Sequence, residues 1–230
     1  MKITLILSLT LIFGFASTAQ KMDKQSEKSY FSSSTISGLT FRSLGPALTS
    51  GRIADIAVHP ENKNVWYVAA ASGGVWKTNN HGTTFDPIFD TYGSYSIACV
   101  ELAPSNPNTL WVGTGENNNQ RSVAYGDGVY KSLDGGRSFK NMGLKSSEHI
   151  GNIIVHPENE NIVWVAAYGP VWSEGGARGV YMTSDGGATW KRTLEISEHT
   201  GIAEIAIDPE NPNILYASAH QRRRREWTYI

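Results

Sequence analysis

The sequence has a single cysteine, Cys99, among its 230 residues, so it cannot form an internal disulfide. It also lacks an excess of one charge, because 20 Lys and Arg residues stand against 21 Asp and Glu residues. A protein that binds nucleic acid through a general basic field is therefore excluded. Cys99 lies in an apolar run, where a small buried thiol is the usual interpretation.

Histidines and acids with metal-ligand spacing are missing as well. His59 and His156 take the same place in two copies of a repeat, where the other copies have Ala103 and Asp208, so we interpret them as turn residues. His149 and His199 stand directly before apolar runs, from where they can reach a binding face. Neither a metal ion nor another cofactor is predicted.

Long hydrophobic runs are limited to one, from Ile3 to Phe15 in MKITLILSLTLIFGFASTA. A lysine before this run and small residues after it indicate a secretory signal peptide over residues 1–19. The run is shorter than a membrane-spanning helix requires, so no span is expected after cleavage. The mature protein is predicted to be secreted, either to the periplasm, the cell surface or the medium. Residues 20–37, rich in Ser and Lys, are predicted to be a flexible leader.

What the sequence does have is repetition. One apolar pattern occurs four times: IADIAVHPENKNVWYVAA, IACVELAPSNPNTLWVGT, IGNIIVHPENENIVWVAA and IAEIAIDPENPNILYASA. The prolines of these copies are 44, 53 and 52 residues apart. A second pattern runs in step with the first and reads TNNHGTTF, SLDGGRSF and TSDGGATW. Self-similarity at about this period is typical of propeller or solenoid arrays.

Each repeat predicts four strands. The first is a short apolar run such as IADIAV, expected to be buried on both faces, and a Pro-Asn turn separates it from a second such as VWYVAA. The third is GVWKT, GVYKS or GVYMT, and the fourth starts at Phe85, Phe139 or Trp190. Four antiparallel strands make one propeller blade.

The predicted fold class is therefore all-β: a β-propeller of four-stranded antiparallel blades over residues 38–230. The repeats amount to about three and a half blades, so we expect a partial ring that is the N-terminal part of a larger propeller. Because a partial ring leaves strand edges uncovered, these 230 residues alone are expected to aggregate or to unfold with little cooperativity.

The Asp turn between third and fourth strands is interpreted as structural rather than catalytic. Its carboxylate can accept hydrogen bonds from N–H groups of the bend, its glycine can adopt positive φ, and its aromatic residue can wedge into the core. Calcium would need about six to eight oxygen ligands, and each copy offers one carboxylate. The residues assigned to this role are Asn80, Gly82, Phe85, Asp134, Gly136, Phe139, Asp185, Gly187 and Trp190.

TSDGGATW and SLDGGRSF resemble the Asp-box repeats of bacterial neuraminidases. Longer segments resemble secreted bacterial proteins related to the sortilin-type propeller, which are often labelled glycosyl hydrolases. These segments are GRIADIAVHPENKNVWYVAAASGGVWKT, YGDGVYKSLDGGRSF and ARGVYMTSDGGATW. The resemblance covers about residues 39–230 and implies a propeller similar to the N-terminal part of sortilin.

A glycoside hydrolase is the alternative to a binding or scaffold module. Glycoside hydrolysis usually needs two carboxyl groups, or a tyrosine nucleophile in sialidases. Xyloglucanases of similar build carry a catalytic Asp before the paired glycines of the first blade, where this sequence has Ala71 and Ser72. Arg52, Arg121 and Arg178 could surround a sialidase substrate, but the Arg-Ile-Pro element of sialidases is absent. No catalytic residue is assigned.

The binding face is predicted from the longest and most variable loops. In a propeller, loops from second to third strands share one face with loops between blades, whereas Pro-Asn and Asp turns share the other. The variable segments mix aromatic, amide and charged residues, as binding loops on a rigid scaffold do. They are expected to be exposed and to recognise a protein or a glycan. The candidate contacts are Arg52, Glu116, Arg121, Tyr125, Asp127, Trp172, Glu174 and Arg178. The run from Arg222 to Arg225 is interpreted as a solvated or ion-paired loop.

The first testable prediction concerns processing. If residues 1–19 are a signal peptide, the exported protein begins at Gln20, open or cyclised to pyroglutamate. Mass spectrometry of the N-terminal peptide of exported material checks this. Exported protein that still begins at Met1 would contradict the secretory assignment.

Overall fold

The computed structural model describes residues 35, 37–39, 51–118, 123–225 and 228–229. The chain divides into two compact units, Met1–Ala47 and Leu48–Ile230. The predicted signal peptide and nearly all of the predicted leader lie outside the described residues. Within the described part of the chain, no helix has the length and apolar character needed to cross a bilayer. The repeats all fall in the second unit, to which the rest of the description applies.

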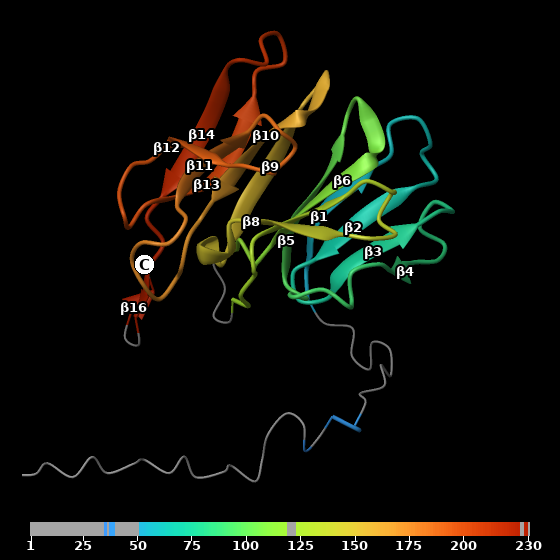
Figure 1. Ribbon diagram of the computed structural model, residues 1–230, viewed down its shortest axis with the longest axis horizontal. Helices are drawn as coiled ribbons and strands as arrows, with labels where there is room; N and C mark the ends of the chain where they lie inside the picture. Colours follow the sequence, from blue (N-terminus) through green and yellow to red (C-terminus); the bar gives the residue numbers. More distant parts are fainter. Residues whose placement is uncertain (1–34, 36, 40–50, 119–122, 226–227, 230) are drawn as a thin grey trace, which may run out of the picture. The chain divides into compact units, whose positions relative to one another are not determined.

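Strands account for almost all regular structure in the second unit, and they form antiparallel sheets in sequence order (Figure 1). The first sheet has β1 (Ile53–Val58), β2 (Trp66–Ala70), β3 (Gly74–Thr78) and β4 (Asp86–Pro87). The second has β5 (Ile97–Ala103), β6 (Asn106–Thr114), β7 (Val129–Ser132) and β8 (Lys140–Gly143). The third has β9 (Ile150–His156), β10 (Asn159–Ala167), β11 (Gly179–Thr183) and β12 (Lys191–Leu194).

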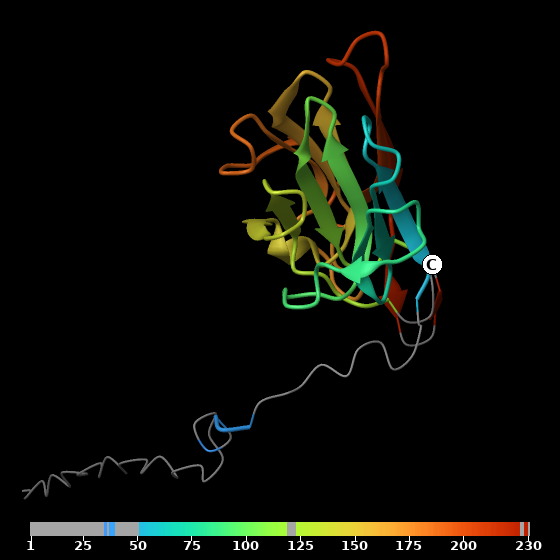
Figure 2. The same cartoon turned by 90° about the vertical axis from the view of Figure 1, so that its right-hand side faces the viewer.

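A two-stranded sheet follows, made of β13 (Gly201–Ile207) and β14 (Leu215–His220). A short hairpin, β15 (Arg224–Arg225) with β16 (Thr228–Tyr229), ends the described strands, and a 3-10 turn, η1 (Lys145–Ser147), precedes β9. The predicted all-β fold of four-stranded antiparallel blades is confirmed, with three full blades and two strands of a fourth. The turns between first and second strands point to the same side, at the top of Figures 1 and 2.

Neighbouring blades pack through their apolar faces. The first strands stand side by side, because β1 contacts β5, β5 contacts β9, and β9 contacts β13. Between the first two blades, Tyr67, Phe89 and Leu110 belong to one buried cluster, and Phe89 stacks edge-on against Tyr130 with 5.0 Å between ring centroids. Each full burial of such a side chain contributes about 1.5 to 3 kcal/mol. The core therefore lies between blades rather than within any one of them.

The expectation that first strands are buried on both faces holds for β5 but not for β1. β5 has a blade on either side and is buried along almost its whole length, Cys99 included. β1 has a described blade only on its β5 side, so Ile53 and Ile56 are exposed. Burial of a first strand therefore depends on both neighbouring blades being present.

Side chains of the first strands also bond to the backbone of the next blade. Asp55 accepts a hydrogen bond from the N–H of Val100 at 3.0 Å, and Asn152 donates one to the carbonyl of Ile205 at 3.2 Å. The register shifts at these positions in β1 and β9. These bonds satisfy backbone groups on the inner edge of a sheet, which would otherwise be unpaired.

The Asp turns are closed by their own side chains. Asp134 accepts hydrogen bonds from the N–H groups of Arg137 and Ser138, both at 2.9 Å, and from the Ser132 hydroxyl at 2.7 Å. Asp185 bonds in the same way to Thr183 and Thr189. Asn80 accepts the N–H of Thr84 in the first blade. The hydrogen-bonding role that the repeat predicts for this position is therefore present in all three turns.

Glycine is required next to these carboxylates. Gly136 and Gly187 have φ of 86° and 95°, and a Cβ on either would lie 2.8 Å from a side-chain atom of the preceding blade. The aromatic residues behave unequally: Trp190 donates its indole N–H to the Met142 carbonyl at 2.7 Å, and Phe139 packs on Phe89. Phe85 is exposed, so the predicted wedge into the core is wrong for the first blade.

A lysine of the preceding blade holds each of the second and third Asp turns. Lys77 donates to the Gly135 carbonyl at 2.9 Å, and Lys131 donates to that of Gly186 at 3.2 Å. Each ammonium also lies about 5 Å above an aromatic ring, that of Tyr67 or Trp111. Burial, the largest cause, lowers the pKa of both lysines. The Asp turns therefore connect one blade to the next.

These turns make stability depend on acid pH. Hydrogen bonds from Ser138 and Thr189, the largest cause, hold the pKa of Asp134 and Asp185 well below the ordinary value of 3.8. A carboxyl whose pKa is lowered by folding stabilises the fold above its unfolded pKa and loses this contribution as the pH falls below it. We expect Tm to decrease from pH 5 to pH 2 in thermal unfolding followed by circular dichroism.

The matched variant is Asp134→Asn/Asp185→Asn. An amide keeps an acceptor oxygen, as Asn80 shows, but cannot ionise, so the decrease of Tm in acid should be smaller in this variant. Asp185→Ala, which removes the acceptor, should instead lower Tm at every pH. An unchanged acid dependence in the double variant would show that these carboxylates do not carry the effect.

Candidate functional site

The variable loops gather at one end of the sheets. In each blade the residue before the first strand bonds through its carbonyl to the residue after the second strand: Arg52 to Ala71 at 2.8 Å and His149 to Tyr168 at 3.0 Å. The N–H of Gly115 bonds likewise to the Ser96 carbonyl at 2.7 Å. We call this end the loop face; its described residues are 52, 71–73, 115–118, 123–128, 168–178, 195–200 and 220–225.

Glu116 lies at the centre of a bonded group rather than on an exposed loop. Its residue is only 3% exposed. The carboxylate pairs with Arg52 at 2.9 Å and accepts hydrogen bonds from the hydroxyl of Ser72 and from the amide of Asn118. The expected exposed contact at Glu116 is therefore replaced by a buried carboxylate that joins the first two blades.

The arginine run is only in part the solvated or ion-paired loop that was predicted: Arg223 pairs with Glu174 at 3.5 Å and Arg225 is exposed, but the other two arginines turn inward. Arg222 and Arg224 are both buried. The Arg222 guanidinium lies 4.7 Å from the ring centroid of Tyr168 and donates to the Asn117 carbonyl at 3.2 Å. Tyr168 also bonds through its hydroxyl to His220 at 2.5 Å. The run turns inward because Arg222 bonds to the loop after β6 and the N–H of Arg224 bonds to the Val171 carbonyl.

His149 is enclosed in the same place. It is 0% exposed, and neither ring nitrogen is hydrogen-bonded in the structure. Burial first, and then the positive charge of Arg222, lower its pKa to about 3, although the Glu116 backbone opposes this shift. The imidazole is therefore neutral under physiological conditions. Tyr125 packs against it with 5.8 Å between ring centroids.

Arg178 has a structural role that the sequence did not indicate. It is 2% exposed, and its guanidinium donates to the carbonyls of Tyr168, Pro170, Ser173 and Gly175, at 2.8 Å to Tyr168 and to Ser173. The expected exposed ligand contact is thus a clamp that closes the loop between β10 and β11. A guanidinium suits this task because its donors form a rigid fork.

Asp127 is likewise engaged within the fold. Its carboxylate accepts a hydrogen bond from the Tyr130 hydroxyl at 2.5 Å, and its other oxygen lies 3.4 Å from the Thr114 hydroxyl. Burial, followed by this bond, raises the pKa of Tyr130. Arg121, another predicted contact, lies outside the described residues. The loop between β6 and β7 therefore presents Tyr125 rather than Asp127.

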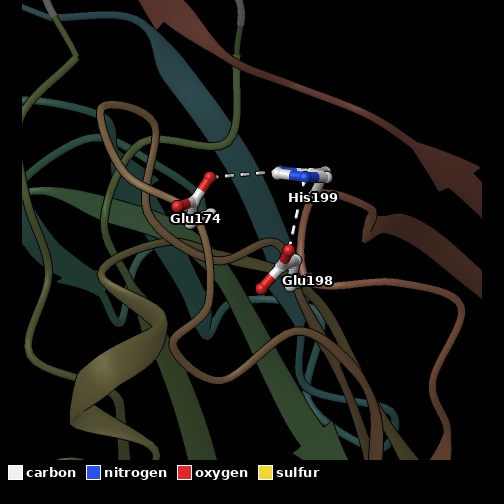
Figure 3. A group of neighbouring side chains, drawn as sticks. All are labelled: Glu174, Glu198 and His199. Atoms are coloured by element: carbon white, nitrogen blue, oxygen red, sulfur yellow. Dashed lines mark ion pairs between the residues drawn. The ribbon is translucent and has the colours of Figure 1, made fainter.

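Four predicted contacts remain exposed on the loop face, and one of them, Arg52, is already paired with Glu116. Trp172 is 49% exposed and Tyr125 is 54% exposed. Glu174 lies near two further groups, Glu198 and His199 (Figure 3). The clamped loop and the loop before β13 are held together by a bond from the N–H of Gly175 to the Glu198 carbonyl at 2.8 Å.

Glu174, Glu198 and His199 have the chemistry of metal ligands, and one ligand atom of each lies within 4.8 Å of the others. Figure 3 shows the imidazole between the two carboxylates: Nδ1 is 3.8 Å from Glu174 and Nε2 is 3.5 Å from Glu198. Each imidazole nitrogen faces a different carboxylate, so a metal ion bound to one nitrogen would replace at least one of these contacts. Arg223 also pairs with Glu174 at 3.5 Å. The group fits an ion-paired junction between loops.

A further acid, Glu101, lies on the first strand of the second blade. Burial first, and Asp55 second, raise the pKa of Glu101, on β5, to about 7. Asp55 itself is committed to the N–H of Val100. The pair could supply an acid and a carboxylate, but Glu101 belongs to the middle of a strand rather than to the loop face.

The candidate contacts did not include Tyr168 and His220, although both begin variable segments of the predicted binding face. Each directly follows the last residue of an apolar repeat, at the place that Ala71 and Gly115 take in the first two repeats. Repeat position therefore indicated their face, but no sequence signal indicated that the two side chains bond to each other.

Comparison with known proteins supports the fold. In sequence, the chain is similar to a xyloglucanase of Hypocrea jecorina (strain QM6a), with 25% identity over 176 residues, which are 71% of this chain and 20% of that protein. No family model matches the chain.

Among solved structures, it is similar to an ancestral GH74 enzyme, with 23% identity and a TM-score of 0.58 over 73% of this chain and 22% of that one. It is also similar to a GH74 enzyme of Niastella koreensis, with 22% identity and a TM-score of 0.57 over 70% and 24% of the two chains. The chain spans about a fifth to a quarter of these relatives, and the structural likeness shows a β-propeller fold.

The role of Arg178 leads to a prediction about stability. Arg178→Ala leaves several buried carbonyls without a donor, so we expect unfolding to become easier by at least about 2 kcal/mol in urea titration. Limited proteolysis should cut the loop between Tyr168 and Gly179 faster in the variant. The control is Arg137→Ala, an exposed arginine of an Asp turn. Equal stability of Arg178→Ala and the control would contradict the clamp.

Proposed function

We propose that this chain belongs to a secreted β-propeller module that binds a protein or a glycan through its loop face. The observation that carries the proposal is Trp172, half exposed on a loop that Arg178 clamps through four carbonyls. A large aromatic ring held on a rigid loop offers much contact area at little cost in conformational entropy.

The surroundings of Trp172 support binding. Tyr125 offers a second exposed ring on a neighbouring loop, and Glu174 offers an exposed carboxylate. Interfaces gain most of their affinity from a few aromatic and arginine residues, with polar groups setting orientation. The signal peptide predicted over residues 1–19 supports secretion, which would place such a face outside the cytoplasm. The sortilin-like resemblance of the repeats fits a receptor or scaffold role.

A glycoside hydrolase is the second candidate, because the sequence is 25% identical to a xyloglucanase over 176 residues. The arrangement of the loop face is less favourable to this reading. Ser72, which stands where a xyloglucanase of this build has its catalytic Asp, donates its hydroxyl to Glu116. Glu116 is in turn paired with Arg52 and bonded to Asn118, so its carboxylate is engaged within the fold rather than free to act on a substrate.

Trp172→Ala tests the binding proposal. We expect a screen of glycans and peptides to identify a ligand, and the variant to bind that ligand at least about tenfold more weakly by isothermal titration. Tm should change by little, because exposed loop residues seldom stabilise a fold. Leu133→Ala removes an exposed side chain from an Asp turn and should leave the affinity unchanged.

The same preparation distinguishes the two candidates. Release of reducing ends from xyloglucan, abolished by Glu101→Gln or Glu116→Gln, would favour the hydrolase. Binding that depends on Trp172 without any release of product would favour the module.

A further inference from the structure

Arg222 is a buried cation without a paired acid. Its residue is 1% exposed, and its guanidinium donates to the carbonyls of Asn117 at 3.2 Å and Glu116 at 3.5 Å and lies over the Tyr168 ring. Among the residues that the structure describes, no carboxylate forms an ion pair with it, and its Nε has no partner. A buried charge is costly unless an opposite charge accompanies it.

His149 adds a second unsatisfied group at the same place. It is fully buried, both of its ring nitrogens lack a hydrogen-bond partner, and Arg222 acts on its titration. Buried polar side chains in folded proteins nearly always have partners. Two neighbouring exceptions, one cationic and one able to donate from either nitrogen, indicate a missing acceptor.

The local charge is positive. Arg224 is also buried, and its positive charge contributes to lowering the pKa of Arg222, after burial as the largest cause. Arg222, Arg224 and Arg178 all contribute to lowering the pKa of His149, again after burial. The charge of Glu116 also acts on Arg222, but its carboxylate is already bound by Arg52, Ser72 and Asn118. The cluster can therefore accept one negative charge without becoming negative overall.

We propose that Arg222 and His149 bind the carboxylate of an acidic sugar at the centre of the loop face. This inference rests on the proposed binding function and names the chemistry of its ligand. A guanidinium can donate two parallel hydrogen bonds to a carboxylate. The groups of Arg222 that now donate to backbone carbonyls could donate to such a ligand instead.

A sugar fits the surroundings better than an acidic peptide does. Tyr125 packs on His149 and is itself half exposed, so one neighbour of the buried imidazole reaches the surface. Trp172 follows Val171, whose carbonyl accepts the N–H of Arg224 at 2.8 Å. Exposed aromatic rings on loops that contact a cationic centre offer flat faces for sugar rings.

The experiment compares Arg222→Met with Arg225→Met, an exposed arginine of the same run, in the full chain. The probes are trigalacturonate, its methyl ester and a hexaglutamate peptide, titrated calorimetrically. We expect wild type and Arg225→Met to bind trigalacturonate, and Arg222→Met to bind it about 10- to 100-fold more weakly. The methyl ester should bind weakly to all three proteins.

Thermal unfolding without ligand provides an independent readout. Replacing an unpaired buried cation with an apolar side chain of similar length should leave Tm unchanged or raise it. A structural clamp would behave in the opposite way, as Arg178→Ala is expected to do. Loss of Tm together with unchanged affinity in Arg222→Met would overturn the inference and leave Arg222 as a packing residue.

The outcomes also separate this inference from the proposed function. If the methyl ester binds as well as trigalacturonate, and Trp172→Ala weakens both, the loop face binds sugars but the anionic centre is wrong. Preference for hexaglutamate that is lost in Arg222→Met would show a peptide site and contradict the choice of a sugar. If no probe binds, the inference is wrong, whereas a ligand found in a broader screen would preserve the proposed function.

Discussion

A blade of this fold cannot bury its apolar face alone, and everything else in the structure depends on that constraint. Tyr67 and Phe89 of the first blade are covered by Leu110 and Tyr130 of the second. The contacts between blades are then reinforced by specific bonds, from Lys77 to the next Asp turn and from Asp55 to the next first strand. Stability in such arrays comes from nearest-neighbour interfaces. β1, with a described neighbour on one side only, accordingly exposes its isoleucines.

This packing makes the loop face rigid. In each blade the start of the first strand lies beside the end of the second strand, so the residues that flank these ends bond to each other. Long polar side chains that enter this place must either bond or carry an unpaired charge. Arg178 illustrates the first case, with its guanidinium surrounded by four carbonyls, and Arg222 illustrates the second. Two buried arginines of similar appearance therefore have opposite consequences: one stabilises the loop and the other provides an unused donor.

The repeats predicted most of the fold. Four apolar runs and three Asp turns in step were enough to place nearly every strand, because strand pairing within a blade is local and follows turn chemistry. The Asp turns were predictable for the same reason: Asp134 and Asp185 bond within their own turns, to residues at most four positions away. Phe85 was not predictable in this way, since its burial depends on another blade.

The candidate site shows where this reasoning ended. Composition and pattern predicted that Glu116, Arg178 and the arginine run lie on one face, because the ends of the strands determine the face on which each loop lies. Whether each was exposed or buried was decided by partners that are far apart in the sequence. Glu116 bonds to residues 64 and 44 positions away, and Arg222 to a carbonyl 105 positions away. The sequence by itself determined the blades and the face, because these follow from local periodicity. Only the tertiary structure decided which charges are paired, because pairing is set by the contacts between blades.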